Sequence, residues 1–88
     1  MKSQKPGRNI LKEAEVTGIT INGIWILIHD HEYFLSYKKY PWFKTSIVKD
    51  IYNLKLLHEN HLYWPNLDVD IELMSLIHPE KYPLVFEN

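Results

Sequence analysis

Two runs of apolar and β-branched residues near the start of the chain are separated by a short polar pair. The first run covers residues 15–21 and has Gly18 at a position suited to a β-bulge. The second run, residues 24–28, is apolar throughout, which predicts a strand covered on both faces, or on one face by a partner. Because Asn22-Gly23 lies between the runs, we expect a hairpin with a two-residue type I′ turn, in which both residues have positive φ.

A third strand is expected after the polar segment HDHE. Residues 33–37 (YFLSY) are rich in the aromatic and apolar residues of a strand, which would complete an antiparallel meander. Pro41 ends this strand, because proline has no N–H for the ladder and presets φ for a turn. The first half of the chain therefore predicts three antiparallel strands.

A helix is expected next, with its start set by a polar cap. Thr45 or Ser46 is suited to the N-cap position, where a side-chain oxygen accepts a hydrogen bond from a backbone N–H group. Helical spacing then places four apolar or aromatic residues on one face: Ile47, Val48, Ile51 and Tyr52.

The end of this helix is ambiguous. The pattern allows the helix to continue to His58, or to end near Asn53. In the second case residues 54–57 and 61–64 pair as a second hairpin about the segment HEN. Periodicity alone does not decide between these two interpretations.

The closing part of the chain alternates strictly and then becomes helical. After Pro65, apolar residues alternate with aspartates in the order Leu67, Asp68, Val69, Asp70, Ile71. That alternation predicts a half-buried strand with its apolar side chains in the core and its aspartates on the outer face. Residues 72–77 then predict about two helical turns, which end at His78-Pro79.

Length and composition indicate one small domain. The 88 residues are 45% hydrophobic and 14% aromatic, with no Cys, so aromatic packing rather than disulfides must hold the core. We expect a flexible basic arm at residues 1–12 and a single domain at residues 13–88. No apolar run approaches the roughly 18–20 residues of a membrane-spanning helix. Since the lack of Cys also fits a reducing compartment, we expect a cytoplasmic protein without membrane contact.

The charge of the chain argues against a strongly basic nucleic-acid binder. The formal net charge is -1, whereas such binders carry a clear basic excess. Basic and aromatic residues interleave around Lys38 and Lys39, which follow Tyr33 and Tyr37 and precede Tyr40. Nucleic-acid contact at this lysine pair, in an accessory domain for transcription regulation, is therefore the alternative function.

Carboxylates and histidines supply the remaining candidate chemistry. Asp68 and Asp70 on one strand face, together with a histidine, would suit a divalent cation and a metal-dependent hydrolase. The five histidines, however, show no recognised ligand spacing such as His-Glu-x-x-His, and there is no Cys ligand. We therefore expect no catalytic residues, no metal and no cofactor. The aspartates are interpreted as the solvent face of a strand that leads into the last helix.

Two segments of the chain together resemble a known bacterial family. They are YFLSYKKYPWF and LYWPNLDVDIELMSLI. The chain is similar to the family catalogued as domain of unknown function 2442, whose members carry a Pro-Trp-aromatic segment and close on a Trp-Pro-x-Leu-Asp-x-Asp-Ile signature. The matching residues are Pro41, Trp42, Trp64, Pro65, Leu67, Asp68, Asp70 and Ile71. The resemblance covers residues 14–77.

The resemblance implies an α+β fold: an antiparallel three-stranded meander, a short helix, a second β-hairpin and a short C-terminal helix. It favours a helix over residues 45–52 and strands near 54–57 and 61–64. Two positions depart from the family pattern. Tyr63 stands where many relatives have His, and Glu72 stands where a Ser cap is usual, so the resemblance implies a weaker cap for the last helix.

The family has no established activity, and the resemblance implies a partner rather than a reaction. Some members are fused to a helix-turn-helix domain, and others are encoded beside another small protein, in an arrangement similar to toxin–antitoxin pairs. We therefore expect a small non-enzymatic interaction or regulatory module, antitoxin-like, whose partner is another small protein or a second copy. Trp42, Tyr63 and Trp64 are the expected anchors if they are exposed. Trp64 and Pro65 are also expected to form the corner between two strands, and Asp68 and Asp70 would hold that corner or meet the partner.

Overall fold

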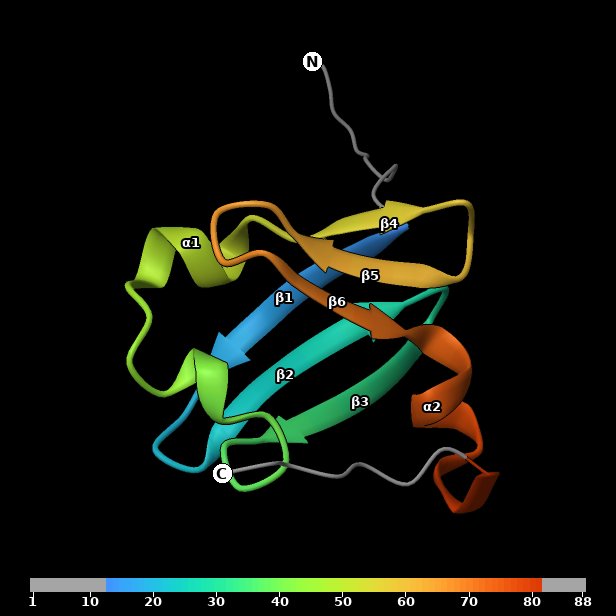
Figure 1. Ribbon diagram of the computed structural model, residues 1–88, viewed down its shortest axis with the longest axis horizontal. Coiled ribbons are helices and arrows are strands. Elements are labelled where there is room, and N and C mark those ends of the chain that lie inside the picture. The colour runs from blue at the N-terminus through green and yellow to red at the C-terminus, as the bar shows by residue number, and fades with distance from the viewer. Residues whose placement is uncertain (1–12, 82–88) are drawn as a thin grey trace.

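Two three-stranded antiparallel sheets, connected by short helices, form the part of the chain that the structure describes (Figure 1). This computed structural model describes residues 13–81, so the expected arm at residues 1–12 and the tail from residue 82 lie outside the described residues. The strands of the first sheet are β1 (Ala14–Ile19), β2 (Gly23–Ile28) and β3 (His31–Ser36), and those of the second are β4 (Lys55–Leu57), β5 (His61–Trp64) and β6 (Val69–Glu72). The expected α+β fold is confirmed.

Four short helical segments occur among the described residues. They are the 3₁₀ helix η1 (Pro41–Phe43) and α1 (Val48–Tyr52) between the sheets, and α2 (Leu73–Ile77) and the 3₁₀ helix η2 (Pro79–Lys81) after β6. Helix α2 ends at His78, as predicted. The side chain of Glu72 makes no cap hydrogen bond within residues 13–81, in line with the weaker cap that the resemblance implies. No helix in this range is long and apolar enough to cross a lipid bilayer.

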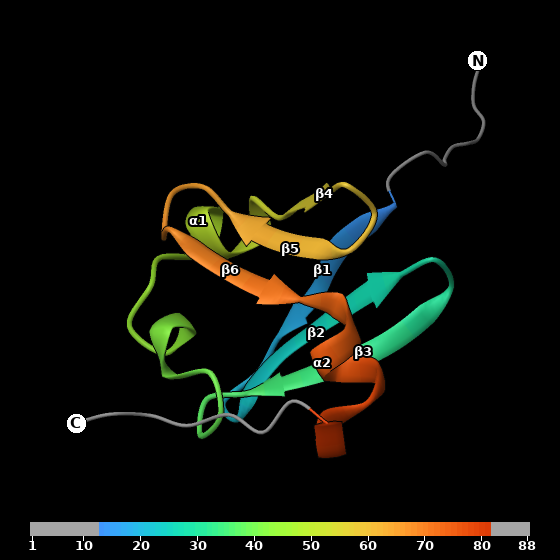
Figure 2. The same ribbon diagram turned by 45° about the vertical axis from the view of Figure 1, so that its right-hand side comes forward.

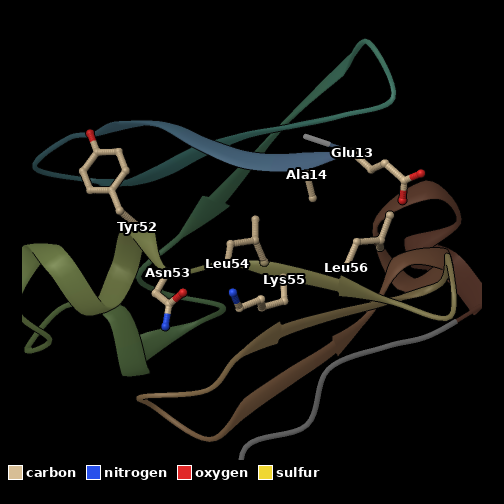
Figure 3. Close-up of a pocket in the computed structure, with 7 residues that line it drawn as sticks. All are labelled: Glu13, Ala14, Tyr52, Asn53, Leu54, Lys55 and Leu56. Atoms are coloured by element: carbon tan, nitrogen blue, oxygen red, sulfur yellow. The ribbon is translucent and has the colours of Figure 1, made fainter. Parts of the chain in front are cut away.

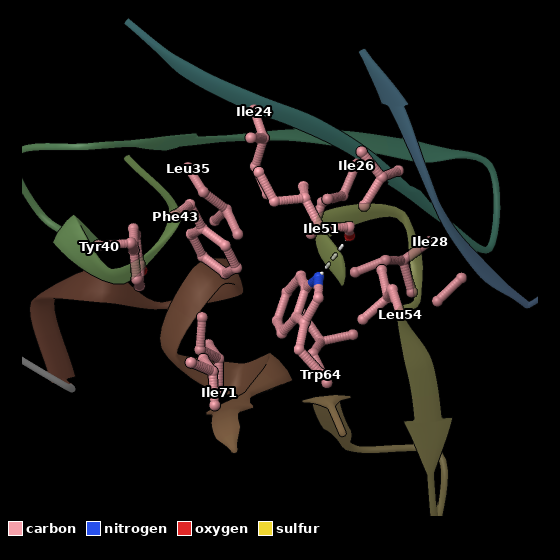
Figure 4. Close-up of a cluster of buried hydrophobic side chains, with 14 of the residues drawn as sticks. Ile24, Ile26, Ile28, Leu35, Tyr40, Phe43, Ile51, Leu54, Trp64 and Ile71 are labelled. Carbon is pink, nitrogen blue, oxygen red and sulfur yellow. Dashed lines mark hydrogen bonds between the residues drawn. The ribbon is translucent and has the colours of Figure 1, made fainter. Parts of the chain in front are cut away.

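The apolar core lies between the two sheets, where their inner faces meet (Figures 2 and 4). Alternate residues of β2 point into it, namely Ile24, Ile26 and Ile28, and Trp64 enters it from β5. Trp25 points the other way and stays 40% exposed. The prediction that β2 is covered on both faces is therefore wrong, because the second sheet covers only the inner face of the first.

The loop between β1 and β2 is longer than the predicted two-residue turn. Neither Asn22 nor Gly23 has a positive φ, and the last β1–β2 pair joins Ile19 to Ile24. A threonine side chain organises the loop instead, since the backbone N–H groups of Asn22 and Gly23 both donate to Thr20 Oγ1 at 3.1 Å. The predicted type I′ turn is wrong here, because a hydroxyl acceptor replaces left-handed residues.

Left-handed turn residues occur at two other hairpins. His29 and Asp30, between β2 and β3, have φ of 48° and 74°, and His58 and Glu59, between β4 and β5, have φ of 54° and 64°. Positive φ at both central residues is the signature of a type I′ turn, whose twist matches that of the flanking strands. None of the four is Gly, and for residues other than Gly, Asn and Asp the left-handed conformation costs about 1–2 kcal/mol. The strand pairing on either side has to offset that cost.

The first α-helix begins later than predicted. It starts at Val48, with Ile47 in the N-cap position, so neither Thr45 nor Ser46 caps it. The Ser46 hydroxyl donates instead to the carbonyl oxygen of Trp42 at 2.7 Å, which ties it to η1. Because β4 and β5 pair directly after the helix, the shorter of the two helix interpretations is confirmed and the longer one is wrong.

A serine at the N-cap is expected to stabilise α1. Ile47 is 58% exposed and has the extended backbone of a cap position, but its side chain offers no oxygen to the first N–H groups of the helix. Ile47→Ser is therefore expected to raise the free energy of unfolding by about 1 kcal/mol in urea denaturation. Val48→Ser is the matched control, since that side chain is 60% exposed and lies inside the helix. Equal stability of the two variants would contradict the cap assignment.

The last strand also begins later than the alternation predicts. β6 starts at Val69, whereas the N–H of Leu67 donates to the carbonyl oxygen of Trp64 at 3.1 Å and Asp68 has φ of 53°. The predicted strand position of Leu67 and Asp68 is therefore wrong, because these residues form the turn that returns the chain beside β5. Val69 and Ile71 are buried as predicted.

Candidate functional site

Trp64 lies at the centre of the core rather than at the surface. Its side chain is fully buried, and its ring meets that of Phe43 edge to face, with 4.7 Å between centroids. The indole N–H donates to the carbonyl oxygen of Ile51 at 2.8 Å (Figure 4), which ties β5 to α1. Trp64 is therefore not exposed to anchor a partner, because a thin core without disulfides uses its largest ring as filling.

The other two expected anchors lie at different places in the molecule. Trp42, on η1, is 44% exposed, and its ring centroid is 6.2 Å from that of Tyr40. Tyr63, on β5, is partly buried and lies opposite Lys55 on one side and Asp70 on the other. Since Trp64 is fully buried while Trp42 and Tyr63 lie on different elements, the three expected anchors do not form one exposed cluster.

The two aspartates of the closing signature have different environments. Asp70 lies on the outer face of the second sheet, where its carboxylate is 3.1 Å from Nδ1 of His61, whereas Asp68 lies in the turn before β6. Within residues 13–81, no three His, Asp or Glu side chains are placed to hold a metal ion. The exposed contact between Asp70 and His61 links two strands and contributes less than about 1 kcal/mol.

The basic pair Lys38 and Lys39 is exposed in the loop after β3, but tyrosines around it are engaged elsewhere. The hydroxyl of Tyr37 donates to the carbonyl oxygen of Thr20 at 2.9 Å, and Tyr40 is buried. Burial raises the pKa of the Tyr40 phenol above its ordinary value of 10.0. The buried neutral ring therefore stabilises the fold at neutral pH, and this contribution is lost as pH rises above about 10. The buried Tyr40 ring is therefore not exposed to stack on a nucleic-acid base.

A pocket of about 330 Å³ opens between β1 and β4 (Figure 3). Leu54 and Leu56 form its apolar side and point toward β1, where Ala14 lies opposite them. Glu13 lies at one end of the pocket, and Tyr52, the last residue of α1, lies at the other. The pocket is therefore bounded by residues from three elements of the fold.

The two charges at this pocket lie at different positions along it. The carboxylate of Glu13 is at the end beside Leu56, whereas the side chain of Lys55 leaves β4 on the side opposite Leu54 and Leu56 and extends toward Asn53 (Figure 3). Both charged residues are exposed. Glu13 therefore favours a cationic group at its end of the pocket, and Lys55 lies at the outer border of the pocket.

Within the described residues 13–81, both strands that border the pocket are edge strands of their sheets. The backbone N–H of His29 donates to the carbonyl oxygen of Glu13 at 3.2 Å, and Ala14 pairs with Ile28. In an antiparallel ladder this makes Ala14–Ile28 a non-hydrogen-bonded pair. The N–H and C=O groups of Ala14, and those of Val16 two residues later, therefore point away from β2, and Ala14 lines the pocket.

Sequence reasoning missed these pocket residues. Glu13, Tyr52, Asn53 and Lys55 belong to no recognisable motif, and they come from segments that are distant in the chain. An indirect signal was present, because β1 and β4 each begin a run of paired strands and so each has an open edge. The packing of one sheet on the other then decides that the two edges face each other.

Comparisons with known proteins agree with the resemblance seen in the sequence. The model of a family described as "Protein of unknown function (DUF2442)" matches residues 13–82. No curated protein and no solved structure matches the chain. The family match includes both sheets and the closing signature. The chain therefore belongs to the DUF2442 family of proteins of unknown function.

Proposed function

We propose that this chain is a non-enzymatic interaction module that binds another protein through the pocket between β1 and β4. The observation that carries the proposal is that two strand edges, to which no further strand pairs among residues 13–81, border one pocket. Unpaired N–H and C=O groups at an edge are a template for a further strand, and many recognition domains bind extended segments in this way. In the cytoplasm, such a module would act as the regulatory, antitoxin-like half of a two-protein system.

The surface beside the pocket is suited to a protein interface. Tyr52 is 45% exposed at the pocket, and Val48, one turn earlier on α1, is exposed as well. Aromatic side chains are enriched at the centres of interfaces, whereas charged groups are found at the rim. Glu13 and Lys55 supply such charged groups along the pocket. The pocket therefore combines apolar and charged side chains, and α1 adds exposed apolar residues.

Exchange of the two pocket charges tests this function. The double variant Glu13→Lys with Lys55→Glu keeps the net charge and reverses the charges along the pocket. The tagged wild-type and variant chains are expressed in the cell of origin, and the captured proteins are quantified by mass spectrometry. We expect the variant to retain about tenfold less of the partner, because two favourable contacts become repulsive.

A second charge exchange, away from the pocket, is the matched control. Glu32→Lys with Lys39→Glu alters two exposed residues on and after β3 and is expected to retain the partner like the wild type. This control also reverses one charge of the basic pair, so it reports any contact made there. Equal loss of partner in both double variants, or a wild-type chain that captures no protein, would contradict the proposed function.

A further inference from the structure

The open edge of β1 is regular over only a short length. Ala14 and Val16 direct their backbone N–H and C=O groups away from β2, but the register shifts between Val16 and Gly18. A bulge of this kind interrupts pairing and twists an edge away from an incoming strand. Within residues 13–81, the groups available for pairing are therefore those of Ala14, which lines the pocket, and of Val16, two residues further along the same edge.

We propose that the pocket takes an extended segment of a partner protein, which adds to β1 as a further strand of the first sheet. This proposal rests on the proposed function and names the part of the partner that is bound. Ala14 and Val16 supply main-chain hydrogen bonds to the segment. Leu54 and Leu56 face β1 across the pocket (Figure 3) and receive the partner side chain that points inward.

Charge and apolar contact set the composition of the bound segment. Glu13 lies at the end of the pocket beside Leu56 (Figure 3). The segment therefore carries Lys or Arg next to Glu13 and an apolar residue over Leu54 and Leu56. Main-chain hydrogen bonds provide affinity, and these two side chains provide specificity.

A second copy of this chain fits the edge less well. If two β1 strands paired antiparallel about an axis at Glu15, the two Glu15 side chains would lie directly opposite each other. An axis at Ala14 would place Glu13 opposite Glu15 of the other copy. Like charges directly opposite destabilise a strand pair, and β1, with the sequence AEVTGI, has no Lys or Arg to neutralise them. The edge therefore favours a partner segment with a basic residue.

Amide hydrogen exchange of the whole chain tests the strand pairing directly. The probe is a linear peptide selected from a displayed random library against the wild-type chain and used at about ten times its Kd. We expect exchange at the Ala14 and Val16 amides to slow by about tenfold, because bound chains are protected there. The Glu15 amide faces β2 and is the internal control, with unchanged exchange.

Peptide chemistry gives a second test that no folding defect of the protein can imitate. N-methylation of successive peptide amides is expected to weaken binding about tenfold at every second position, because alternate N–H groups of an added strand face β1. The selected peptides are expected to carry a base beside an apolar residue. The Glu13→Lys variant is expected to select an acid in place of that base.

Several results would overturn the proposal. A library without binders at the pocket, or peptide binding without slower exchange at Ala14 and Val16, rules out strand pairing. The proposed function then still stands if partner capture depends on Glu13 and Lys55, and fails if that dependence is absent too. If exchange at the Ala14 and Val16 amides slowed when the protein concentration was raised without peptide, the edge would be assigned to pairing with a second copy of the chain. If the peptide bound a chain that starts at Glu13 more than about tenfold more tightly than it binds the whole chain, residues 1–12 would be the segment that competes for the pocket.

Discussion

Replacement of Trp64 by alanine is expected to lower the free energy of unfolding by about 3–5 kcal/mol. The ring is fully buried against Phe43, and its N–H is bonded to the carbonyl oxygen of Ile51. The variant would lose this filling between the sheets and leave a buried carbonyl without its donor. A small domain has a total stability of roughly 5–10 kcal/mol, so the loss removes a large part of it. Urea denaturation followed by circular dichroism measures the change.

Two further variants separate the packing of Trp64 from its hydrogen bond. Trp64→Phe keeps a ring in the core but leaves the Ile51 carbonyl without a donor, and is expected to cost about 1–3 kcal/mol. Trp42→Ala is the control for removal of an indole, since Trp42 is 44% exposed, and is expected to cost less than either core variant. Equal losses of unfolding free energy for Trp42→Ala and Trp64→Ala would contradict the role of Trp64 as a core residue packed between the sheets.

The second large effect is expected at Gly23. A Cβ atom there would collide with the carbonyl oxygen of Leu35 and lie 2.7 Å from Phe34 Cζ and 2.8 Å from Ser36 Cα. Two of these contacts are with the backbone of β3, which cannot turn aside as a flexible side chain would. Gly23→Ala is therefore expected to lower the free energy of unfolding by about 2–3 kcal/mol, measured by the midpoint of urea denaturation.

Gly18 provides the matched control in the same hairpin. A Cβ atom added there meets nothing within 4 Å, even though the residue lies at the bulge of β1. Gly18→Ala is expected to leave stability unchanged or to raise it by about 0.5 kcal/mol, because alanine restricts the unfolded chain. If Gly18→Ala proved as damaging as Gly23→Ala, close approach of β3 would not be the reason for a glycine at position 23.

The positions of most strands could be predicted from the sequence because strand patterns depend on neighbouring residues. The apolar run 24–28 became β2, and Val69 and Ile71 became the buried side of β6. Pro79 marked the end of α2 for a similar reason, since proline restricts the residue before it. Alternation and proline act over a few residues, so they are readable without the fold.

Turn geometry could not be predicted in the same way. The Asn22-Gly23 pair has the composition of a type I′ turn, yet the left-handed residues lie at His29-Asp30 and at the turn before β5. Gly23 is required instead by the close approach of β3. Strand register over the whole sheet decides which residues lie at the turn, and that energy exceeds the local preference of one dipeptide.

The candidate site likewise has features that the sequence predicts and features that depend on the fold. Trp64 and Pro65 were recognisable as a corner in HLYWPNLDVDI, but the sequence left open whether the indole packs inside or meets a partner. By itself the sequence determined the strand pattern, the aromatic core and the family, because these depend on composition and on neighbouring residues. Only the tertiary structure decided that Trp64 is buried and that the open edges of β1 and β4 border one pocket, because both depend on contacts between residues far apart in the chain.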